Sequence, residues 1–334
     1  MDFIGLVSIG STNFRYTAAT PAGDFLTDIV VESTQPRQLA AQLGAAIDDL
    51  QATAALDAVS ISAPGLIDAE TGKIRKLDTP DGDVIDHVDI RAPLQRQYDL
   101  PIYLENDCTA SALGEWHFGA REDHDCVIHL TIGTGIGGGV VDRGHLLRGD
   151  SAQAGEFGLI PVAPDSDLES TGVTGAWEAF CSGRGIPDYV CHRFSTDEDW
   201  ADSTRDSEFR QTLAAGDNLA APAVFDAADR GDRFAQACLE QVGRYNAVGI
   251  AAICNAFNPG LITLGGGVAL NNSEWLLEGI DSSLDEFLFV DRPAIRLTPL
   301  GDDIGLYGSL GVVADRSPAS RSGDSGRSVN GTLD

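Results

Sequence analysis

Short apolar runs recur along the whole chain, and most of them end in residues that favour turns. Runs of this kind are typical of buried strands. They predict strands over residues 3–9, 24–32, 58–62, 100–104, 127–132, 138–142 and 261–264. Longer segments, in which apolar residues recur every three or four positions, predict helices. These segments are residues 39–56, 109–118, 176–190 and 233–258.

The two halves of the chain echo each other. Each half opens with a strand, a turn that contains Gly and Thr, and a return strand. The turns are Gly10-Ser11-Thr12 in the first half and Gly133-Thr134-Gly135 in the second. No repeat of short period is present, so a solenoid is not expected. Residues 196–217 are highly charged and predict an irregular excursion on the surface.

The charge of the chain indicates the salt in which it works. Its formal net charge is −29 with a sequence pI of about 4.3, and Lys73 and Lys76 are its only lysines. Excess carboxylates with so little lysine suit molar salt, where the screening length falls to roughly 3 Å and self-repulsion is muted. We therefore predict a halophilic protein, with an ordinary acidic cytosolic enzyme as the alternative.

Composition also excludes several classes of partner. An acidic surface repels nucleic-acid phosphates, and no basic stripe offsets it. No apolar run approaches the length of a membrane span, and the first residues lack a signal-peptide pattern. The six cysteines form no C-x-x-C motif, which predicts free and mostly buried thiols. We expect a cytoplasmic protein without nucleic-acid or membrane partners.

Two motifs at predicted strand ends carry the candidate chemistry. Leu104-Glu105-Asn106-Asp107 places a carboxylate at the end of one strand. Ile132-Gly133-Thr134-Gly135-Ile136-Gly137-Gly138-Gly139 follows another and offers backbone N–H groups with few side chains to keep a phosphate away. A base near a phosphate cradle indicates phosphoryl transfer to a hydroxyl group.

Each motif also has a purely structural explanation. Asp107 precedes a predicted helix and could serve as its N-cap. The glycines could form a plain β-turn that requires positive φ, although four glycines in five residues exceed that need. The Gly265-Gly266-Gly267 segment could reflect only close packing of a strand on a helix.

Five segments in this order resemble the ROK family (repressors, open reading frames, sugar kinases), within the ribonuclease-H-like actin/hexokinase superfamily. The resemblance runs from about Phe3 to Val313. Its most specific stretches are Ala63-Pro64-Gly65, Leu104-Glu105-Asn106-Asp107, Gly133-Thr134-Gly135-Ile136-Gly137-Gly138-Gly139, Gly155-Glu156-Phe157-Gly158 and Leu264-Gly265-Gly266-Gly267.

The resemblance implies a fold and an assembly. Two α/β domains would close around an interdomain cleft: a small N-terminal domain over residues 1–118 and a larger C-terminal domain over 119–304. A helix at about 305–315 would return to the first domain, and residues 316–334, rich in Ser, Gly and Arg, would form a disordered tail. The family also implies a homodimer.

The resemblance further implies the roles of individual residues. Asp107 would be the general base toward a sugar hydroxyl. The other sugar-binding residues would be Pro64, Gly65, Asn106, Glu156 and Glu178. The nucleotide and its phosphates would be bound by Gly10, Ser11, Thr12, Asn13, Gly133, Thr134, Gly135, Gly265, Gly266 and Gly267.

Two departures from the family pattern concern metals. Ser8 stands where the first phosphate loop normally has an aspartate, and serine is a poor ligand for Mg²⁺. The family's zinc site uses one His and three Cys, and those positions here are Leu159, Glu169, Thr171 and Ala176. We therefore expect no structural zinc and no metal ligands from the protein, with Mg²⁺ held through phosphates and water.

Together these features predict an ATP-dependent hexose kinase that converts glucose to glucose 6-phosphate. The substituted Ser8 and Leu159 leave open an alternative, a weak or inactive sugar-binding regulatory relative. An actin-like structural ATPase is a third hypothesis, against which the Ala-Pro-Gly and Glu-Asn-Asp motifs argue. Direct DNA repression is not expected, because the first strand begins at Phe3 without a preceding helix-turn-helix and the chain is acidic.

Overall fold

The computed structural model describes residues 1–79, 83–196, 207–214 and 219–316. The predicted charged excursion and the predicted disordered tail lie largely outside these residues. The chain divides into two compact units. Unit 1 consists of Met1–Phe118 and the segment from Gly305 onward, and unit 2 of Gly119–Ile304.

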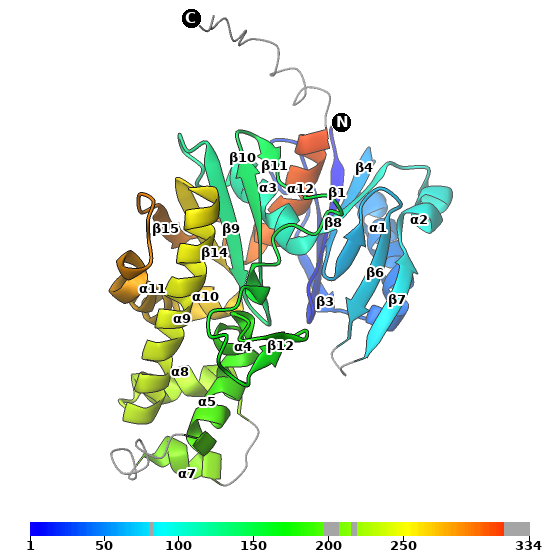
Figure 1. The fold of residues 1–334 in the computed structure, drawn as a ribbon. Helices are drawn as coiled ribbons and strands as arrows, with labels where there is room; N and C mark the ends of the chain where they lie inside the picture. The colour runs from blue at the N-terminus through cyan, green and yellow to red at the C-terminus, as the bar shows by residue number, and fades with distance from the viewer. Residues whose placement is uncertain (80–82, 197–206, 215–218, 317–334) are drawn as a thin grey trace, which may run out of the picture. The chain divides into compact units, whose positions relative to one another are not determined.

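The main sheet of unit 1 is mixed (Figure 1). Its strands are β1 (Ile4–Ile9), β2 (Asn13–Ala19), β3 (Val30–Ser33), β4 (Ala58–Ala63) and β8 (Ile102–Asn106), in the order β3-β2-β1-β4-β8. β1, β2 and β3 pair antiparallel, whereas β4 and β8 run parallel to β1. A separate antiparallel sheet consists of β5 (Leu66–Asp68), β6 (Lys73–Asp78) and β7 (Val84–Asp89).

Helices cover both faces of the main sheet of unit 1. They are α1 (Leu39–Thr53), α2 (Arg91–Tyr98), α3 (Asp107–Phe118) and α12 (Ile304–Arg316). Side chains alternate along β1, so Val7 and Ile9 join the core cluster of α1, while Ile4 and Leu6 pack with apolar residues of α12. The nearly continuous apolar runs in the sequence are therefore explained by a sheet that is buried on both faces.

α3 and α12 approach each other at backbone distance. A Cβ atom added to Gly308 would lie 2.8 Å from the backbone carbonyl carbon of Ala110, and one added to Gly114 would lie 2.8 Å from the Gly308 nitrogen. No side chain fits between the helices at this level. The close packing fixes α12 against the helix that begins at Asp107.

The main sheet of unit 2 repeats the arrangement of unit 1. Its strands are β9 (Cys126–Ile132), β10 (Ile136–Asp142), β11 (His145–Leu146), β14 (Leu261–Gly265) and β15 (Ala294–Leu297), in the order β11-β10-β9-β14-β15. Again three strands pair antiparallel and two run parallel to the first. The echo between the halves is therefore confirmed, including the hairpin turns at Gly10-Ser11-Thr12 and Gly133-Thr134-Gly135. A small hairpin of β12 (Glu169–Ser170) and β13 (Val173–Thr174) lies apart from this sheet.

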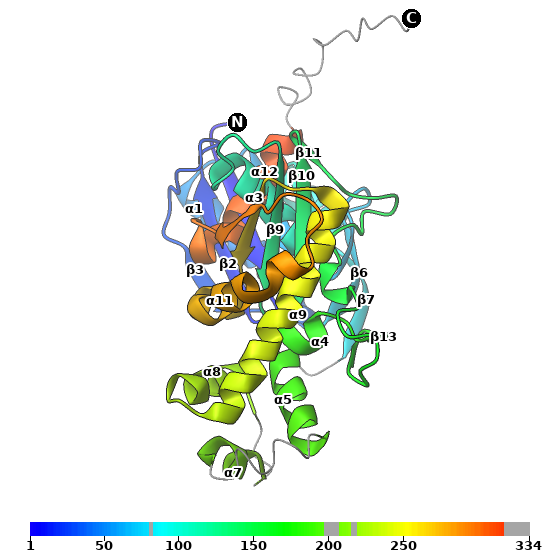
Figure 2. The same cartoon turned by 60° about the vertical axis from the view of Figure 1, so that its left-hand side comes forward.

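The helices of unit 2 include one long helix that packs against several shorter ones (Figure 2). They are α4 (Glu178–Cys181), α5 (Gly185–Thr196), α7 (Glu208–Ala214), α8 (Ala221–Asp229), α9 (Arg233–Phe257), α10 (Gly267–Asn271) and α11 (Ser273–Ser283). The predicted long helix is confirmed as α9: the Asp232 carboxylate caps its start, and Asn258 ends it in a left-handed conformation.

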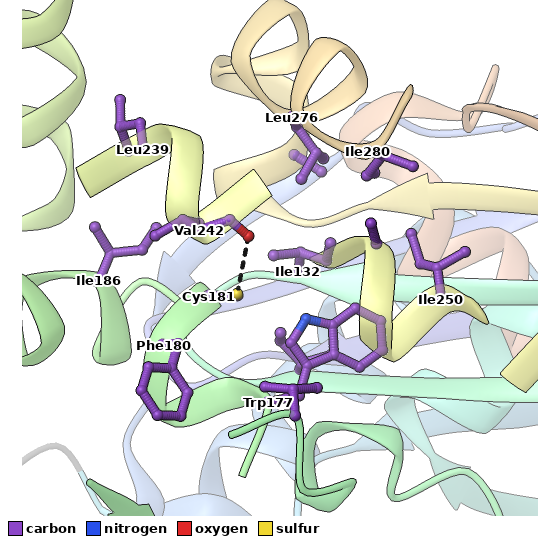
Figure 3. Close-up of a cluster of buried hydrophobic side chains, with 14 of the residues drawn as sticks. Ile132, Trp177, Phe180, Cys181, Ile186, Leu239, Val242, Ile250, Leu276 and Ile280 are labelled. Atoms are coloured by element: carbon purple, nitrogen blue, oxygen red, sulfur yellow. Dashed lines mark hydrogen bonds between the residues drawn. The ribbon is translucent and has the colours of Figure 1, made fainter. Parts of the chain in front are cut away.

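Trp177 is fully buried at the centre of the unit 2 core (Figure 3). Its indole Nε1 donates to Asn246 Oδ1 at 2.8 Å. The ring leaves no room on α9 at Gly249, where an added Cβ would lie 2.4 Å from it. The Cys181 thiol donates to the Val242 carbonyl at 3.4 Å, so α4 is tied to α9 by both packing and hydrogen bonds.

Two predicted elements differ from the structure. In place of one strand over 24–32, the structure has an isolated β-bridge at Phe25 and the short strand β3. Between them the Thr27 hydroxyl accepts from the Ala18 N–H and so replaces a backbone partner. The helix predicted over 176–190 is broken into α4 and α5. The Ser182 hydroxyl turns back to the Glu178 carbonyl at 2.7 Å, and the chain bends through Gly183.

The cysteines are free thiols, as predicted, but fewer are buried than expected. Cys181, Cys238 and Cys254 are buried. Cys108 and Cys126 are half-buried, and Cys191 is exposed. Among the described residues, no helix combines the length and apolar character that crossing a membrane requires.

His129 is a fully buried imidazole in the core of unit 2. Its Nδ1 shares a hydrogen bond of 2.9 Å with the Thr263 hydroxyl across β9 and β14. Its Nε2 is buried without a hydrogen-bond partner in the described part of the chain. Burial disfavours the charged ring and lowers the pKa of His129 to about 3.

This buried imidazole should make the protein acid-sensitive. As pH falls below about 6.5, His129 becomes protonated in the unfolded chain, whereas in the folded protein it stays neutral until about pH 3. The free energy of unfolding should therefore decrease by about 1.4 kcal/mol per pH unit from this residue alone. Denaturant titrations between pH 6.5 and 5 should show that the free energy of unfolding of His129→Gln changes less steeply with pH than that of the wild type. His145→Gln, which changes an exposed ring, should keep the wild-type slope, and equal slopes for all three proteins would contradict the assignment.

Candidate functional site

Asn106 and Asp107 lie where β8 ends and α3 begins. Asn106 Oδ1 accepts from the Cys108 and Thr109 N–H groups at 3.0 and 3.1 Å, so Asn106 caps the helix. One oxygen of Asp107 accepts from the Cys108 N–H at 2.9 Å. Because Asn106 already caps α3, capping alone does not explain an aspartate at position 107.

The Pro64-Gly65 turn lies beside this junction. Ala63 pairs with Asn106 in the sheet, and the Asn106 amide donates to the Gly65 carbonyl at 3.3 Å. Gly65 has a φ of +89°, and a Cβ there would lie 2.0 Å from the Lys76 carbonyl oxygen. The structure thus brings together Pro64, Gly65, Asn106 and Asp107, which the sequence separates by about forty residues.

The environment of Asp107 favours its neutral form. Removal from water raises the pKa of the Asp107 carboxyl group, and hydrogen bonding from Cys108 opposes this rise only in part. A carboxylate with a raised pKa is a stronger proton acceptor than a solvated one. Asp107 is therefore chemically suited to remove a proton from a hydroxyl group.

The first glycine turn of unit 1 is an exposed hairpin loop. The Gly10 N–H donates to the Asn13 carbonyl at 2.8 Å, and Thr34 donates from its hydroxyl to the Gly10 carbonyl at 2.8 Å. Ser11, Thr12 and Asn13 are exposed at its tip.

Ser8 points from β1 toward α12. A Cβ added to Gly305 would lie 2.2 Å from the Ser8 hydroxyl. A short side chain therefore fills the position at which the family pattern has a carboxylate.

In unit 2 the Gly133-Thr134-Gly135 turn is closed by the Gly133 N–H, which donates to the Gly135 carbonyl at 3.0 Å. Neither glycine has a positive φ, so the turn does not require glycine for its backbone conformation. A Cβ on Gly133 would meet its nearest atom, the Gly267 nitrogen, at 3.8 Å, an ordinary contact. Nothing within the described chain demands glycine at position 133, which fits a site where a ligand approaches the backbone.

Glycines farther along the same run serve packing instead. A Cβ on Gly138 would lie 2.6 Å from the His129 carbonyl oxygen, and the Gly138 N–H donates to the Gly155 carbonyl at 3.0 Å. Gly155 has a φ of +104°, and its Cβ would lie 2.1 Å from the Gly138 oxygen. The glycines of this motif therefore have two separate reasons. Those at the turn leave the backbone open, and Gly138 permits close contact with a neighbouring backbone.

Two further loops meet the Gly133-Thr134-Gly135 turn. A Cβ on Gly266, whose φ is +87°, would lie 2.6 Å from the Ile132 carbonyl oxygen, so the Gly265-Gly266-Gly267 segment is pressed against the turn. The Gly183 N–H donates to the Gly133 carbonyl at 2.7 Å, and the Arg184 N–H to the Thr134 carbonyl at 3.4 Å. Sequence reasoning missed Gly183 and Arg184. The glycines on both sides of Arg184 were the available signal.

Glu156 and Glu178 both lie in unit 2. Glu156 is exposed directly before a single turn of 3₁₀ helix, Phe157–Leu159. Glu178 is half-buried, and its carboxylate accepts from the Ile136 N–H at 3.0 Å and from the Ser170 hydroxyl at 2.5 Å. Glu178 is thus attached to the backbone immediately after the Gly133-Thr134-Gly135 turn.

The four positions of the family's zinc site hold no imidazole and no thiolate in this chain. Leu159 packs against the core, Ala176 is fully buried, and Glu169 and Thr171 are exposed on the β12–β13 hairpin. Within the described residues, no three His, Cys, Asp or Glu side chains lie close enough together to hold a metal ion.

Comparisons with known proteins identify the relatives of this chain. Residues 4–316 match the family model described as the ROK family. The chain is 31% identical to the glucokinase of Thermotoga maritima over 261 residues, which cover 77% of this chain and 79% of that protein.

Two solved structures are also similar. A ROK hexokinase from Thermus thermophilus matches with a TM-score of 0.74 and 30% identity, over 93% of this chain and 97% of that one. A ROK family glucokinase from Streptomyces griseus, solved with glucose and AMPPNP, matches with a TM-score of 0.73 and 28% identity, over 92% and 98%. Both similarities confirm the predicted two-domain α/β fold of the hexokinase type.

The raised pKa of Asp107 predicts that this residue lowers stability at neutral pH. Below the ordinary aspartate pKa of about 4 the carboxyl group is neutral in both the folded and the unfolded protein. As pH rises from there, the unfolded chain loses this proton more readily than the folded protein does, so stability is lost until pH has passed the higher folded-state pKa. Asp107→Asn should therefore raise Tm by a few degrees at pH 7, with a difference that shrinks toward pH 4. Calorimetry at both pH values measures this. Asp188→Asn, an exposed aspartate in the first turn of α5, should lower Tm slightly, and a lower Tm for Asp107→Asn as well would overturn the argument.

Proposed function

The chain belongs to the ROK family, and we propose that it transfers the γ-phosphoryl group of ATP to a hydroxyl group of glucose, forming glucose 6-phosphate. The observation that carries this proposal is Asp107, a carboxyl group of raised pKa at the β8–α3 junction beside Asn106. The similarity to glucokinases, one of them solved with glucose and AMPPNP, supports glucose and ATP as the substrates.

The residues of the β8–α3 junction would bind and activate the sugar. Asp107 would accept the proton of the attacking hydroxyl as its oxygen approaches the γ-phosphorus. Asn106 would hydrogen-bond the sugar and orient it. Its own side chain is fixed by hydrogen bonds to the start of α3 and to the Gly65 carbonyl. Pro64 and Gly65 would contact it through their backbone. Glu156 and Glu178 would supply further acceptors for sugar hydroxyls from unit 2.

The phosphates would lie against backbone rather than side chains. In unit 2 the bare surface at Gly133, with Thr134 and Gly135, would receive the β- and γ-phosphates. The Gly265-Gly266-Gly267 segment, pressed against that turn, would line the adenosine side. In unit 1 the exposed loop from Gly10 to Asn13 would supply the remaining contacts.

The side chains assigned to this site would bind Mg²⁺ only indirectly, through the nucleotide. Ser8 offers a hydroxyl where a carboxylate would be the natural ligand, so phosphate oxygens and water would hold the ion. When bound, Mg²⁺ neutralises charge on the phosphates during transfer. No residue of this chain is assigned to it directly.

The surroundings of the protein follow from its composition. We infer a halophilic, cytoplasmic enzyme of haloarchaeal origin from the net charge of −29 and the near absence of lysine. A homodimer is inferred from the family resemblance, and the family's structural zinc is inferred to be absent.

A second function is favoured by one observation. Ser8 packs against Gly305 at the end of β1 and leaves no carboxylate there. A protein that binds sugar and regulates another process, with little or no turnover, is therefore the alternative.

The kinase proposal predicts sugar-dependent turnover. Purified protein with glucose, ATP and Mg²⁺ in molar KCl should form glucose 6-phosphate, measured by a coupled dehydrogenase assay or mass spectrometry. Asp107→Asn should lower kcat by roughly a hundred- to ten-thousandfold, because the general base is lost. The variant should remain folded, since Asn keeps an acceptor for the Cys108 N–H.

A folded wild type that binds glucose but turns over no hexose or amino sugar would favour the regulatory alternative. In that case a gain of activity in Ser8→Asp would identify the substituted residue as the cause.

The charge balance predicts a requirement for salt. Lowering KCl from molar concentration to about 0.1 M lengthens the screening distance from roughly 3 to roughly 10 Å, so carboxylates repel one another across the surface. The protein should lose its folded far-ultraviolet circular dichroism on dilution. Sucrose at matched viscosity should not replace the salt. A Tm that is unchanged at 0.1 M KCl would refute halophily.

A further inference from the structure

Glu178 connects the Gly133-Thr134-Gly135 turn to a separate hairpin of unit 2. One carboxylate oxygen accepts from the Ile136 N–H at 3.0 Å, and the other accepts from the Ser170 hydroxyl at 2.5 Å. Ile136 is the first residue of β10 after the turn, and Ser170 lies in β12. Figure 1 shows α4, which begins at Glu178, next to β12, in agreement with their contacts.

The carboxylate lies directly on the backbone of the site. A Cβ added to Gly135 would lie 2.9 Å from Glu178 Oε2, and one added to Gly158 would lie 2.8 Å from the same atom. No side chain can separate the carboxylate from either loop. Glu178 therefore contacts both the turn proposed to hold phosphate and the segment that follows Glu156.

The main chain of Glu178 supports the same turn from its other side. Its carbonyl accepts from the Ser182 hydroxyl at 2.7 Å, and that hydroxyl accepts from the Gly185 N–H at 3.0 Å. A Cβ on Gly185 would lie 2.1 Å from the Glu178 carbonyl oxygen. This compact bend presents the Gly183 N–H to the Gly133 carbonyl at 2.7 Å. One residue thus fixes both ends of the turn, with its side chain at Ile136 and its backbone through Gly183.

Ser170 is held rigidly enough to orient the carboxylate. It pairs with Val173 across a two-residue turn in which Thr171 and Gly172 have φ of +51° and +81°. Positive φ at both central residues is the geometry that matches the twist of a tight hairpin. A hydroxyl on such a hairpin fixes the carboxylate rotamer, since a charge-assisted hydrogen bond is stronger than a neutral one.

We propose that Glu178 and Ser170 are positioning residues for the Gly133-Thr134-Gly135 turn, so that the β12–β13 hairpin sets the orientation of the phosphate-binding backbone. The kinetic part of this inference rests on the proposed kinase function. The role is additional to the sugar binding proposed for Glu178.

Hydrogen–deuterium exchange tests the structural part without any need for turnover. Ser170→Ala should increase exchange of the Ile136 amide by roughly tenfold, because its carboxylate acceptor becomes free to change rotamer. Thr174→Ala removes an exposed hydroxyl from the same hairpin and should leave that exchange unchanged. Unaltered Ile136 exchange in Ser170→Ala, with the hairpin still folded, would overturn the proposal.

Steady-state kinetics separate positioning from sugar binding. In Ser170→Ala, kcat/KM for ATP should fall by roughly tenfold, while KM for glucose should change less than twofold. The Ser170→Ala/Glu178→Gln double variant should be no slower than Glu178→Gln alone, because both substitutions disrupt the same connection, the Ser170–Glu178 hydrogen bond. A rise in KM for glucose alone, or strictly additive losses, would refute positioning. Absence of turnover in the wild type would refute the kinase function instead, and the exchange measurement would still decide the inference.

Discussion

Close approach of one backbone to another is the constraint on which the site of this protein depends. In unit 2 a Cβ on Gly155 would lie 2.1 Å from the Gly138 oxygen, and one on Gly266 would lie 2.6 Å from the Ile132 oxygen. In unit 1 Gly308 is similarly pressed against Ala110. Because these contacts leave no room for side chains, they bring loops from distant parts of the chain to within hydrogen-bond distance of one another.

The two units use one topology for different chemistry. Each has three antiparallel strands followed by two parallel ones, with a glycine turn after the first strand. In unit 1 the fifth strand leads into Asn106 and Asp107, which place a carboxyl group of raised pKa at the start of a helix. In unit 2 the corresponding turn has Thr134 as its only residue with a side chain, and it is contacted by Gly183, Gly266 and, at Ile136, by Glu178. The repeat supplies equivalent positions, and the local residues decide what each position does.

At two places this chain lacks the metal ligands of the family pattern. Ser8 retains a short polar side chain beside Gly305, and the loop that lacks zinc ligands retains a hairpin that hydrogen-bonds to Glu178. A hydrogen bond of a carboxylate with a hydroxyl is weaker than coordination by a metal, but it needs no ion.

The sequence alone determined strands β1, β4, β8, β9, β10 and β14, the long helix α9, the repeated halves and the choice of Asp107 as a candidate base. These features follow from local periodicity and from motifs that are contiguous in the chain. Only the tertiary structure decided that Asn106, not Asp107, caps α3, that 176–190 breaks at Ser182, and that Glu178 reaches Ile136. The first two depend on short-range side-chain hydrogen bonds, at Asn106 and Ser182, that compete with alternatives the sequence equally allows. The third joins groups that are 42 residues apart in the chain. The reason for each glycine was likewise decided by its neighbours, since an open backbone at Gly133 and a packed one at Gly138 are identical as letters in a sequence.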